Sequence, residues 1–282
     1  MATGLYIHVP FCARACPYCD FDFVVGRHPE VDGYFAGLAA EVASRRQQGE
    51  VLPRHYDTVY FGGGTPSLLG VDGLVRLVEW VRREFPGSGG TEWTVEVNPE
   101  HGCEALFVAL KAAGVTRVSL GIQTLDPDGL EELGRVHRRE QALASIEQAH
   151  RAGLAVSADL ILGYRRQHSR GLARDIDVLT ASGATHISVY ALTVEANTPW
   201  VKLVRRGKRE MPDSDAQAKL LGEAEARFAA QGFAHYEIAS YGHSGHQAQH
   251  NRIYWTWCNY TGLGPSAHSA TYAASGAVRR RG

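Results

Sequence analysis

The chain has 282 residues, a formal net charge of −1 at pH 7, 44% hydrophobic residues and 21% charged residues. These values are typical of a globular protein with one large domain or two smaller ones, and they give no bulk electrostatic basis for binding nucleic acid. No apolar run approaches the roughly 20 residues of a membrane-spanning helix, and the N-terminus lacks the pattern of a signal peptide. We therefore expect a cytoplasmic protein with no membrane span, and leave its oligomeric state open.

Strand-like and helix-like segments alternate through most of the chain. The strands are predicted at residues 5–9, 58–61, 93–97, 117–121, 155–162 and 186–192. The helices are predicted at residues 34–47, 73–84, 104–113, 128–133, 140–152, 172–182 and 216–231. Six βα units in succession indicate an α/β fold in which a parallel sheet carries helices outside it, wound in one hand. A barrel and an open, doubly wound sheet are the two possible outcomes.

The position of the polar side chains favours the barrel. A cysteine-rich segment follows the first strand, a triple glycine follows the second, and polar residues end or lie within the others. Chemistry collected on one rim, at the carboxyl ends of the strands, is typical of TIM barrels. We predict a partial (β/α)6 TIM-like barrel at residues 1–232 and a short C-terminal extension at residues 233–282.

Three cysteines, Cys12, Cys16 and Cys19, have the spacing C-x3-C-x2-C directly after the first predicted strand. Three thiolates can hold three irons of a [4Fe-4S] cube and leave the fourth iron open to a substrate or cosubstrate. A zinc site completed from elsewhere and a group of unrelated buried thiols are the alternatives. A disulfide framework is disfavoured, because the cysteine count of 5 is odd and a chain of this size does not need one. Tyr18 can offer its ring to a bound planar group.

The second motif, GGGTP at residues 62–66, follows a predicted strand and precedes a predicted helix. It is neither a Walker A loop nor a G-x-G-x-x-G fingerprint. Glycines let the backbone come close to a ligand and expose its N–H and C=O groups, so the motif predicts a binding loop. A tight βα turn without a ligand is the alternative.

The cysteine motif, with an aromatic residue before its third cysteine, resembles the signature of the radical S-adenosylmethionine (SAM) superfamily. The flanking YIHVPFC (residues 6–12) and PYCDF (residues 17–21) resemble the group of oxygen-independent coproporphyrinogen III oxidases and HemW-type heme chaperones. This resemblance implies a [4Fe-4S] cluster and SAM as cofactors. In that superfamily SAM chelates the open iron, and an electron from the cluster cleaves it to methionine and a 5′-deoxyadenosyl radical.

The same resemblance implies that SAM contacts residues on the rim. These are Tyr6, Gly63, Gly64, Thr65, Glu96, Gln123, Arg135 and Asp159, and Tyr18 joins the predicted cofactor site because of its ring between the cysteines. The residue types suit the ligand, because carboxylates can bind ribose hydroxyls and the amino group, while Arg135 can bind a carboxylate. Taken singly, Arg135 as a surface arginine and Asp159 as a turn residue are the alternatives, and the number of SAM molecules stays open.

Two features favour the chaperones over the oxidases. The oxidases carry a further Cys two positions beyond the third cluster ligand, where this chain has Phe21. HNRIYW, at residues 250–255, matches the H-N-x-x-Y-W motif of the chaperones, in which the His is implicated in heme binding. Neutral imidazole is a standard axial ligand of heme iron, so His250 is the predicted heme residue. A structural histidine is the alternative, and the rival ligands are His243, His246, His268 and Cys258.

We therefore predict a heme chaperone that binds a [4Fe-4S] cluster, SAM and heme, and passes heme to apo-hemoproteins. A coproporphyrinogen III oxidase and a degenerate radical SAM scaffold with only a binding role are the alternatives. Two features depart from the family. GYRRQH at residues 163–168 stands where the family usually has GLPGQT, and the chain stops soon after His268, where relatives continue into a further domain. The resemblance thus describes an apparently truncated protein.

Overall fold

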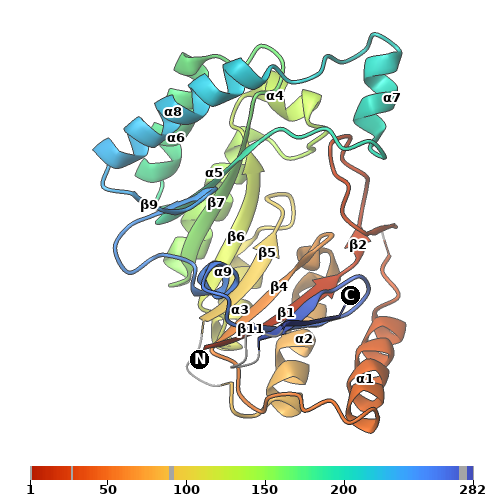
Figure 1. Cartoon of the computed structure of the whole chain (residues 1–282). Helices are drawn as coiled ribbons and strands as arrows, with labels where there is room; N and C mark the ends of the chain where they lie inside the picture. The colour runs from red at the N-terminus through yellow and green to blue at the C-terminus, as the bar shows by residue number, and fades with distance from the viewer. Residues whose placement is uncertain (1, 27, 89–91, 273–277, 282) are drawn as a thin grey trace.

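The structure of the protein is a computed structural model that describes residues 2–26, 28–88, 92–272 and 278–281. Within these residues, one curved sheet of 11 strands runs in the order β13-β12-β11-β1-β4-β5-β6-β7-β8-β10-β9 (Figure 1). The strands from β11 to β8 are parallel to one another, and helices lie outside them. The predicted partial TIM-like barrel is therefore confirmed. It has one more parallel strand than predicted, because β11 pairs with β1 in the sheet.

The six predicted strands form the centre of this sheet in chain order. They are β1 (Thr3–Val9), β4 (Thr58–Gly63), β5 (Glu92–Val97), β6 (Arg117–Gln123), β7 (Ala155–Leu162) and β8 (His186–Ala191). All six are confirmed, with ends that differ from the prediction by at most two residues. Side chains alternate along each strand, so apolar residues such as Phe61, Val95 and Val118 are buried, while the intervening polar residues line the hollow inside the sheet.

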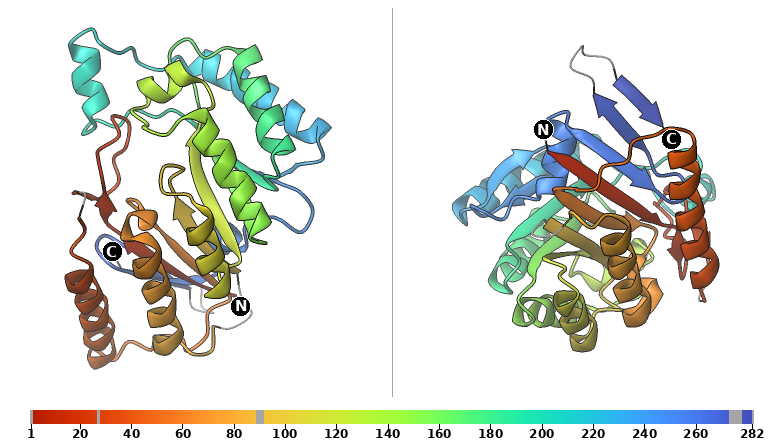
Figure 2. Two further views of the ribbon diagram at one scale, coloured as in Figure 1. Left: turned by 180° about the vertical axis from the view of Figure 1, so that it is seen from behind. Right: turned by 90° about the horizontal axis from the view of Figure 1, so that it is seen from below.

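The predicted helices are also confirmed, with ends shifted by at most three residues, and Figure 2 shows them on the outer face of the sheet. They are α1 (Val31–Gln47), α2 (Gly70–Glu84), α3 (Glu104–Ala112), α4 (Pro127–Glu132), α5 (Arg139–Arg151), α6 (Ser169–Ala181) and α8 (Ser214–Ala230). Their buried leucines, valines and isoleucines join the outward residues of the strands in one core. The sequence analysis missed a 3-10 turn, η1 (Pro66–Leu69), and α7 (Pro199–Arg205).

The segment after α8 extends the sheet at both of its edges. First β9 (Ala234–Glu237) and β10 (Ser240–Gly242) add antiparallel strands beyond β8. The chain then forms α9 (Gln249–Trp255) and returns to the opposite edge. There β11 (Asn259–Leu263) pairs in parallel with β1, and β12 (Ser269–Tyr272) and β13 (Val278–Arg281) follow antiparallel. The sequence analysis missed these elements, and its boundary between residues 232 and 233 stays a prediction.

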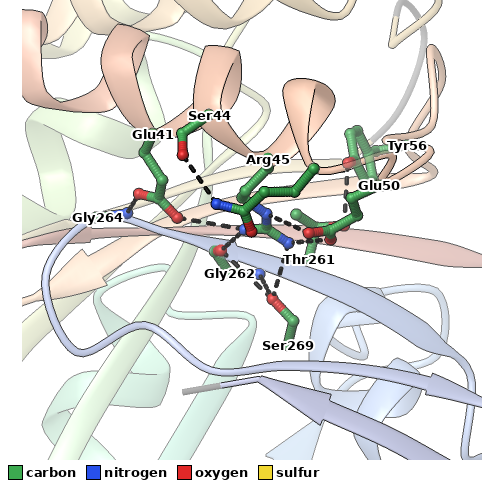
Figure 3. Close-up of polar contacts among 10 residues, drawn as sticks. Glu41, Ser44, Arg45, Glu50, Tyr56, Thr261, Gly262, Gly264 and Ser269 are labelled. Atoms are coloured by element: carbon green, nitrogen blue, oxygen red, sulfur yellow. Dashed lines mark hydrogen bonds and ion pairs between the residues drawn. The ribbon is translucent and has the colours of Figure 1, made fainter.

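A buried arginine attaches this returning segment to the first helix (Figure 3). Arg45 of α1 is 1% exposed. Its guanidinium donates to the Gly262 carbonyl at 2.7 Å, to the Glu50 carboxylate at 2.6 and 3.0 Å, and to the Ser269 hydroxyl at 3.3 Å. Glu41, one helical turn before Arg45, accepts from the Gly264 N–H at 2.8 Å. One cation thus holds α1, β11 and β12 together.

Helix α9 closes the amino-terminal end of the barrel. Its first two N–H groups, of Gln249 and His250, each donate at 3.0 Å to the Glu92 carboxylate at the start of β5. A carboxylate at this position satisfies donors that the helix cannot pair internally. The His250 ring then reaches Thr58 at the start of β4, with Nδ1 and Oγ1 2.7 Å apart. The helix therefore forms a floor beneath the hollow of the sheet.

Candidate functional site

A cavity of about 660 Å³ occupies the hollow above α9. It is lined by nearly all the residues predicted to bind the cluster and SAM, namely Cys12, Cys16, Tyr18, Cys19, Gly63, Gly64, Thr65, Glu96, Gln123, Arg135 and Asp159. Most come from the carboxyl ends of β4, β5 and β6 and from the loops after β1, β4 and α4, and Asp159 lies within β7. Parallel strands bring these ends to one rim, which is why residues far apart in sequence meet here.

The loop that carries the three cysteines is fixed at several points. Its start, β2 (Phe11–Cys12), pairs in parallel with β3 (Val24–Val25) at its end. Within the loop, the Cys19 N–H donates to the Cys16 carbonyl at 3.2 Å. A residue outside the loop, Trp200 at the start of α7, donates its backbone N–H to the Pro17 carbonyl at 2.8 Å. These bonds keep all three thiols at one cavity wall.

The three thiols lie in different electrostatic surroundings. Burial raises the pKa of Cys12 and that of Cys19, the latter to about 11. The Arg135 guanidinium lies beside the Cys16 sulfur, with Nη1 3.7 Å away. Among the described residues, no three His, Cys, Asp or Glu side chains are grouped to hold one metal ion. A cube places its irons at separate corners, so three thiols facing one space fit it.

The glycine turn after β4 lies directly against the cysteine loop. The Gly64 N–H donates to the Val9 carbonyl at 2.8 Å, and a Cβ on Gly64 would lie 2.7 Å from the Phe11 carbonyl oxygen and 3.1 Å from the Cys12 sulfur. Gly63 has a φ of 113°, a backbone conformation that residues with a Cβ rarely adopt. Thr65 brings its hydroxyl 3.4 Å from the Cys12 sulfur. The turn is tight because it has to pass this close to the cysteines.

Two carboxylates face the cavity from β5 and β7, the strands on either side of β6. Glu96 accepts from the Tyr60 hydroxyl at 2.8 Å and from the Gly63 N–H at 3.2 Å, and Asp159 accepts from the Ser119 hydroxyl at 3.2 Å. Burial raises the pKa of Glu96 to about 7, with a contribution from Asp159, and burial also raises the pKa of Asp159 to about 6. A ligand with an ammonium or hydroxyl groups would relieve the cost of these buried charges.

Arg135 brings a buried cation to the same cavity. Arg135 donates to the Asn98 side-chain oxygen at 2.7 Å and to the Gly121 carbonyl at 3.1 Å, while its Nε is buried with no partner among the described groups. Gln123 ends β6 with a φ of 66°, an uncommon conformation for a residue other than glycine. Sequence reasoning missed Asn98, along with Tyr60 and Ser119, which hold the predicted side chains. Alternation along the strands was the signal that could have found them.

Two predicted residues lie outside this cavity. Tyr6 lines a neighbouring cavity of about 400 Å³ that shares Gly63 with the first. His250 is 1% exposed within the floor, where Nδ1 pairs with Thr58 at 2.7 Å and Nε2 pairs with the Tyr254 hydroxyl at 2.8 Å. Desolvation lowers the pKa of His250 to about 3, so the ring is neutral. Their roles toward SAM and heme stay predictions.

The raised pKa of Glu96 gives a stability prediction for the cluster-free protein. The Glu96 carboxyl binds its proton more tightly in the folded state than in the unfolded state, where its pKa is near 4.5. The free energy of unfolding therefore falls as the pH rises from about 4.5 to about 7, and it stays low at higher pH. Glu96→Gln removes the charge. We expect it to raise the free energy of unfolding at pH 8 by about 1 to 3 kcal/mol, with little effect at pH 4. Urea unfolding measured at both pH values checks this.

Glu100, on the same cavity wall, is the matched control. Despite its burial, its contact with His137 lowers the pKa of this carboxyl to about 2. The Glu100 charge is therefore favourable in the folded state. Its contribution to stability is fully present above the pKa of the unfolded state and is lost as the pH falls through the lower pKa of the folded state. Glu100→Gln should destabilise the protein at pH 8. The same sign for both variants would contradict the assigned electrostatics.

Comparisons with known proteins agree with this geometry. The model of the radical SAM superfamily matches residues 6–205. In structure, the chain is similar to the coproporphyrinogen III oxidase HemN from Escherichia coli, a radical SAM enzyme, with a TM-score of 0.79 and 22% identity over 95% of this chain and 64% of that one. The fold and the superfamily match define a radical SAM protein, a class that implies a [4Fe-4S] cluster and SAM.

The sequence relatives narrow the class. The heme chaperone HemW of Mycobacterium tuberculosis is 39% identical over 94% of this chain and 68% of its own length. The heme chaperone HemW of Bacillus subtilis is 34% identical over 93% and 69%, respectively. The chain therefore belongs to the HemW family of the radical SAM superfamily. It spans about two thirds of the length of these relatives, and none of its described helices is long and apolar enough to cross a membrane.

Proposed function

We propose that the protein is a heme chaperone that binds a [4Fe-4S] cluster and SAM in the 660 Å³ cavity and delivers heme to apo-hemoproteins. The observation that carries the proposal is the convergence of three thiols, a glycine turn and two carboxylates on one rim, in a chain whose relatives are named heme chaperones. The cytoplasm, where thiols stay reduced, is the compartment that suits such a cluster.

The residues of the cavity have distinct tasks in this proposal. Cys12, Cys16 and Cys19 hold the cluster, which supplies an electron when it is reduced. Arg135 has a spare N–H for the carboxylate of SAM, and the turn at Gly63 and Gly64, which has no side chain in the way, leaves room for the ligand beside Cys12. The remaining contacts fall to Tyr18, Thr65, Glu96, Gln123 and Asp159.

A coproporphyrinogen III oxidase is the second candidate, favoured by the fold similarity to HemN. Similarity at 22% identity concerns the fold alone. At the position where the oxidases have a further cysteine, this chain has Phe21, which is 65% exposed on the rim. A phenylalanine can neither exchange a proton nor bind iron, so this position does not support the oxidase.

One anaerobic experiment separates the two candidates. The reconstituted protein is incubated with SAM, a reductant and coproporphyrinogen III, and separately with ferric heme and an apo-hemoprotein. We expect a Soret band on heme addition, transfer of heme to the apo-hemoprotein, and no decarboxylated porphyrinogen. Sustained decarboxylation would contradict the chaperone proposal. A protein that binds the cluster and SAM but no heme would favour the third alternative, a degenerate radical SAM scaffold with only a binding role.

A further inference from the structure

The second cavity, of about 400 Å³, joins four parts of the chain that are distant in sequence. It is lined by Tyr6, His8, Asp20, Phe21, Asp22, Gly63, Tyr254, Tyr260, Ser266 and His268. The first strand, the end of the cysteine loop, the glycine turn after β4 and the returning C-terminal segment each supply part of the lining. Gly63 and Phe21 also line the first cavity, so the two spaces adjoin. Its volume falls within the range of about 300 to 1,000 Å³ typical of small-molecule sites.

The walls of this second cavity suit a flat apolar ligand. Tyr254 and Tyr260 meet edge to face, with ring centroids 4.8 Å apart, and Tyr254 remains 38% exposed. Phe21, which also lines this cavity, exposes 65% of its surface. Large aromatic rings left open to water around one hollow gain free energy when a planar ring system covers them.

One of the two histidines that line this cavity is available to bind a metal. The ring of His8 is occupied, because Nε2 lies 2.8 Å from the Asp22 carbonyl oxygen and Nδ1 lies 3.3 Å from the Tyr6 hydroxyl. The ring of His268 is exposed, and the described residues give it no hydrogen-bond partner. Its backbone passes close to β11, since a Cβ on Gly262 would lie 2.2 Å from the His268 carbonyl oxygen. The cavity is thus lined by an accessible imidazole.

His250, by contrast, has no lone pair to offer. A neutral imidazole has one N–H donor and one acceptor nitrogen, and here each faces a hydroxyl, of Thr58 and of Tyr254. Its ring is also covered by Tyr60, with centroids 5.0 Å apart. The contact with Tyr254 connects this buried residue to the second cavity. His250 can therefore act on a ligand there only through the placement of the Tyr254 ring.

We propose that heme lies in the second cavity with its iron bound to His268 and its porphyrin against Tyr254, Tyr260 and Phe21. His250 is then a positioning residue that holds Tyr254. This inference rests on the proposed heme chaperone function and assigns its site. Asp20 and Asp22 are acidic, and the described lining contains no Lys or Arg, so the propionates extend into solvent. Heme that is held by a single iron ligand, with its propionates in solvent, can leave the site and pass to another protein.

Heme titration of the reconstituted holoprotein tests the site. We expect His268→Gly to lose the Soret position of the histidine-bound form and to bind ferric heme about tenfold more weakly or worse. Added imidazole should restore the spectrum, since it can replace the missing ligand but not a structural contact. His250→Gln and Tyr254→Phe should keep the wild-type Soret position and bind more weakly. His243→Ala, a variant on the loop after β10 outside the cavity, should match wild type. Heme dimethyl ester should bind as well as heme.

The outcomes separate this site from the function it serves. A wild-type protein that shows no Soret band refutes the proposed function itself. Heme binding that is lost in His250→Gln but retained with an unchanged spectrum in His268→Gly overturns the site and leaves the function standing. Circular dichroism of each variant shows that it is folded, and Tyr254→Phe tests the positioning role without removing His250.

Discussion

Replacing Cys16 with alanine is expected to abolish assembly of the iron–sulfur cluster. Cys16 lies between the other two thiols on the loop and beside the Arg135 guanidinium, and the two thiols that remain cannot hold three corners of a cube. Anaerobic reconstitution should bring wild type to about four irons and four sulfides per chain and leave Cys16→Ala below about one. Iron and sulfide analysis, with the absorption spectrum near 400 nm, measures the difference.

Cys103 supplies the control for this experiment. It lies exposed just before α3, does not line the cavity and is free of any disulfide. Cys103→Ala should therefore assemble a full cluster and bind SAM as wild type does. If Cys16→Ala kept its iron, or if both variants lost it equally, the cysteine loop would not be the cluster site.

Loss of Arg45 is expected to cause the largest change in stability. Removing one member of a buried ion pair typically costs about 3 to 5 kcal/mol because the partner groups lose their counter-charge, and the lower end applies here because the Glu50 side chain keeps 23% exposure. In Arg45→Ala these groups are the Glu50 carboxylate and the Gly262 carbonyl, at the junction of α1 with β11 (Figure 3). We expect the free energy of unfolding, measured in urea, to fall by about that amount. Limited proteolysis should begin in the segment after α9.

The adjacent arginine is a matched control for this prediction. Arg46 on α1 pairs with Glu84 of α2, and the pair lies at the surface with the Arg46 side chain half exposed. Exposed pairs contribute about 0 to 1 kcal/mol. Arg46→Ala should therefore have a small effect and should not expose the C-terminal segment to protease. Equal losses from the two variants would show that the network around Arg45 does not anchor β11.

The part of the fold that the sequence predicted correctly is the part with strong local signals. Residues 155–162 were placed without error, because buried parallel strands form short apolar runs between turn residues, and the helices show regular apolar spacing. The strands β9 to β13 have at most five residues each, and their pairing depends on distant partners. The pairing of β11 with β1 has no local signal at all, since it depends on Arg45 and on contacts across the chain.

The candidate site follows a similar division. Residues after successive parallel strands share a rim by geometry, so the sequence could group Cys12, Glu96 and Asp159 in one cavity. It could not place His250, because whether an imidazole is buried and paired depends on Thr58 and Tyr254 in the folded protein. A motif shows which residue types occur together, whereas their orientation comes from packing. The same limit applies to Tyr6, which shares the rim region but lines the neighbouring cavity.

The parallel pairing of β11 with β1 has a consequence for how the protein is made. Thr3 pairs with Asn259, so the first strand to leave the ribosome obtains one of its two neighbours only when residues 259–263 have been translated. Closing so long a loop is slow, and until then β1 presents an open edge to other chains. The cysteine loop can emerge and meet iron early, whereas the wall that contains His268 comes last. A nascent chain could thus mature its inorganic centre before it could hold any porphyrin.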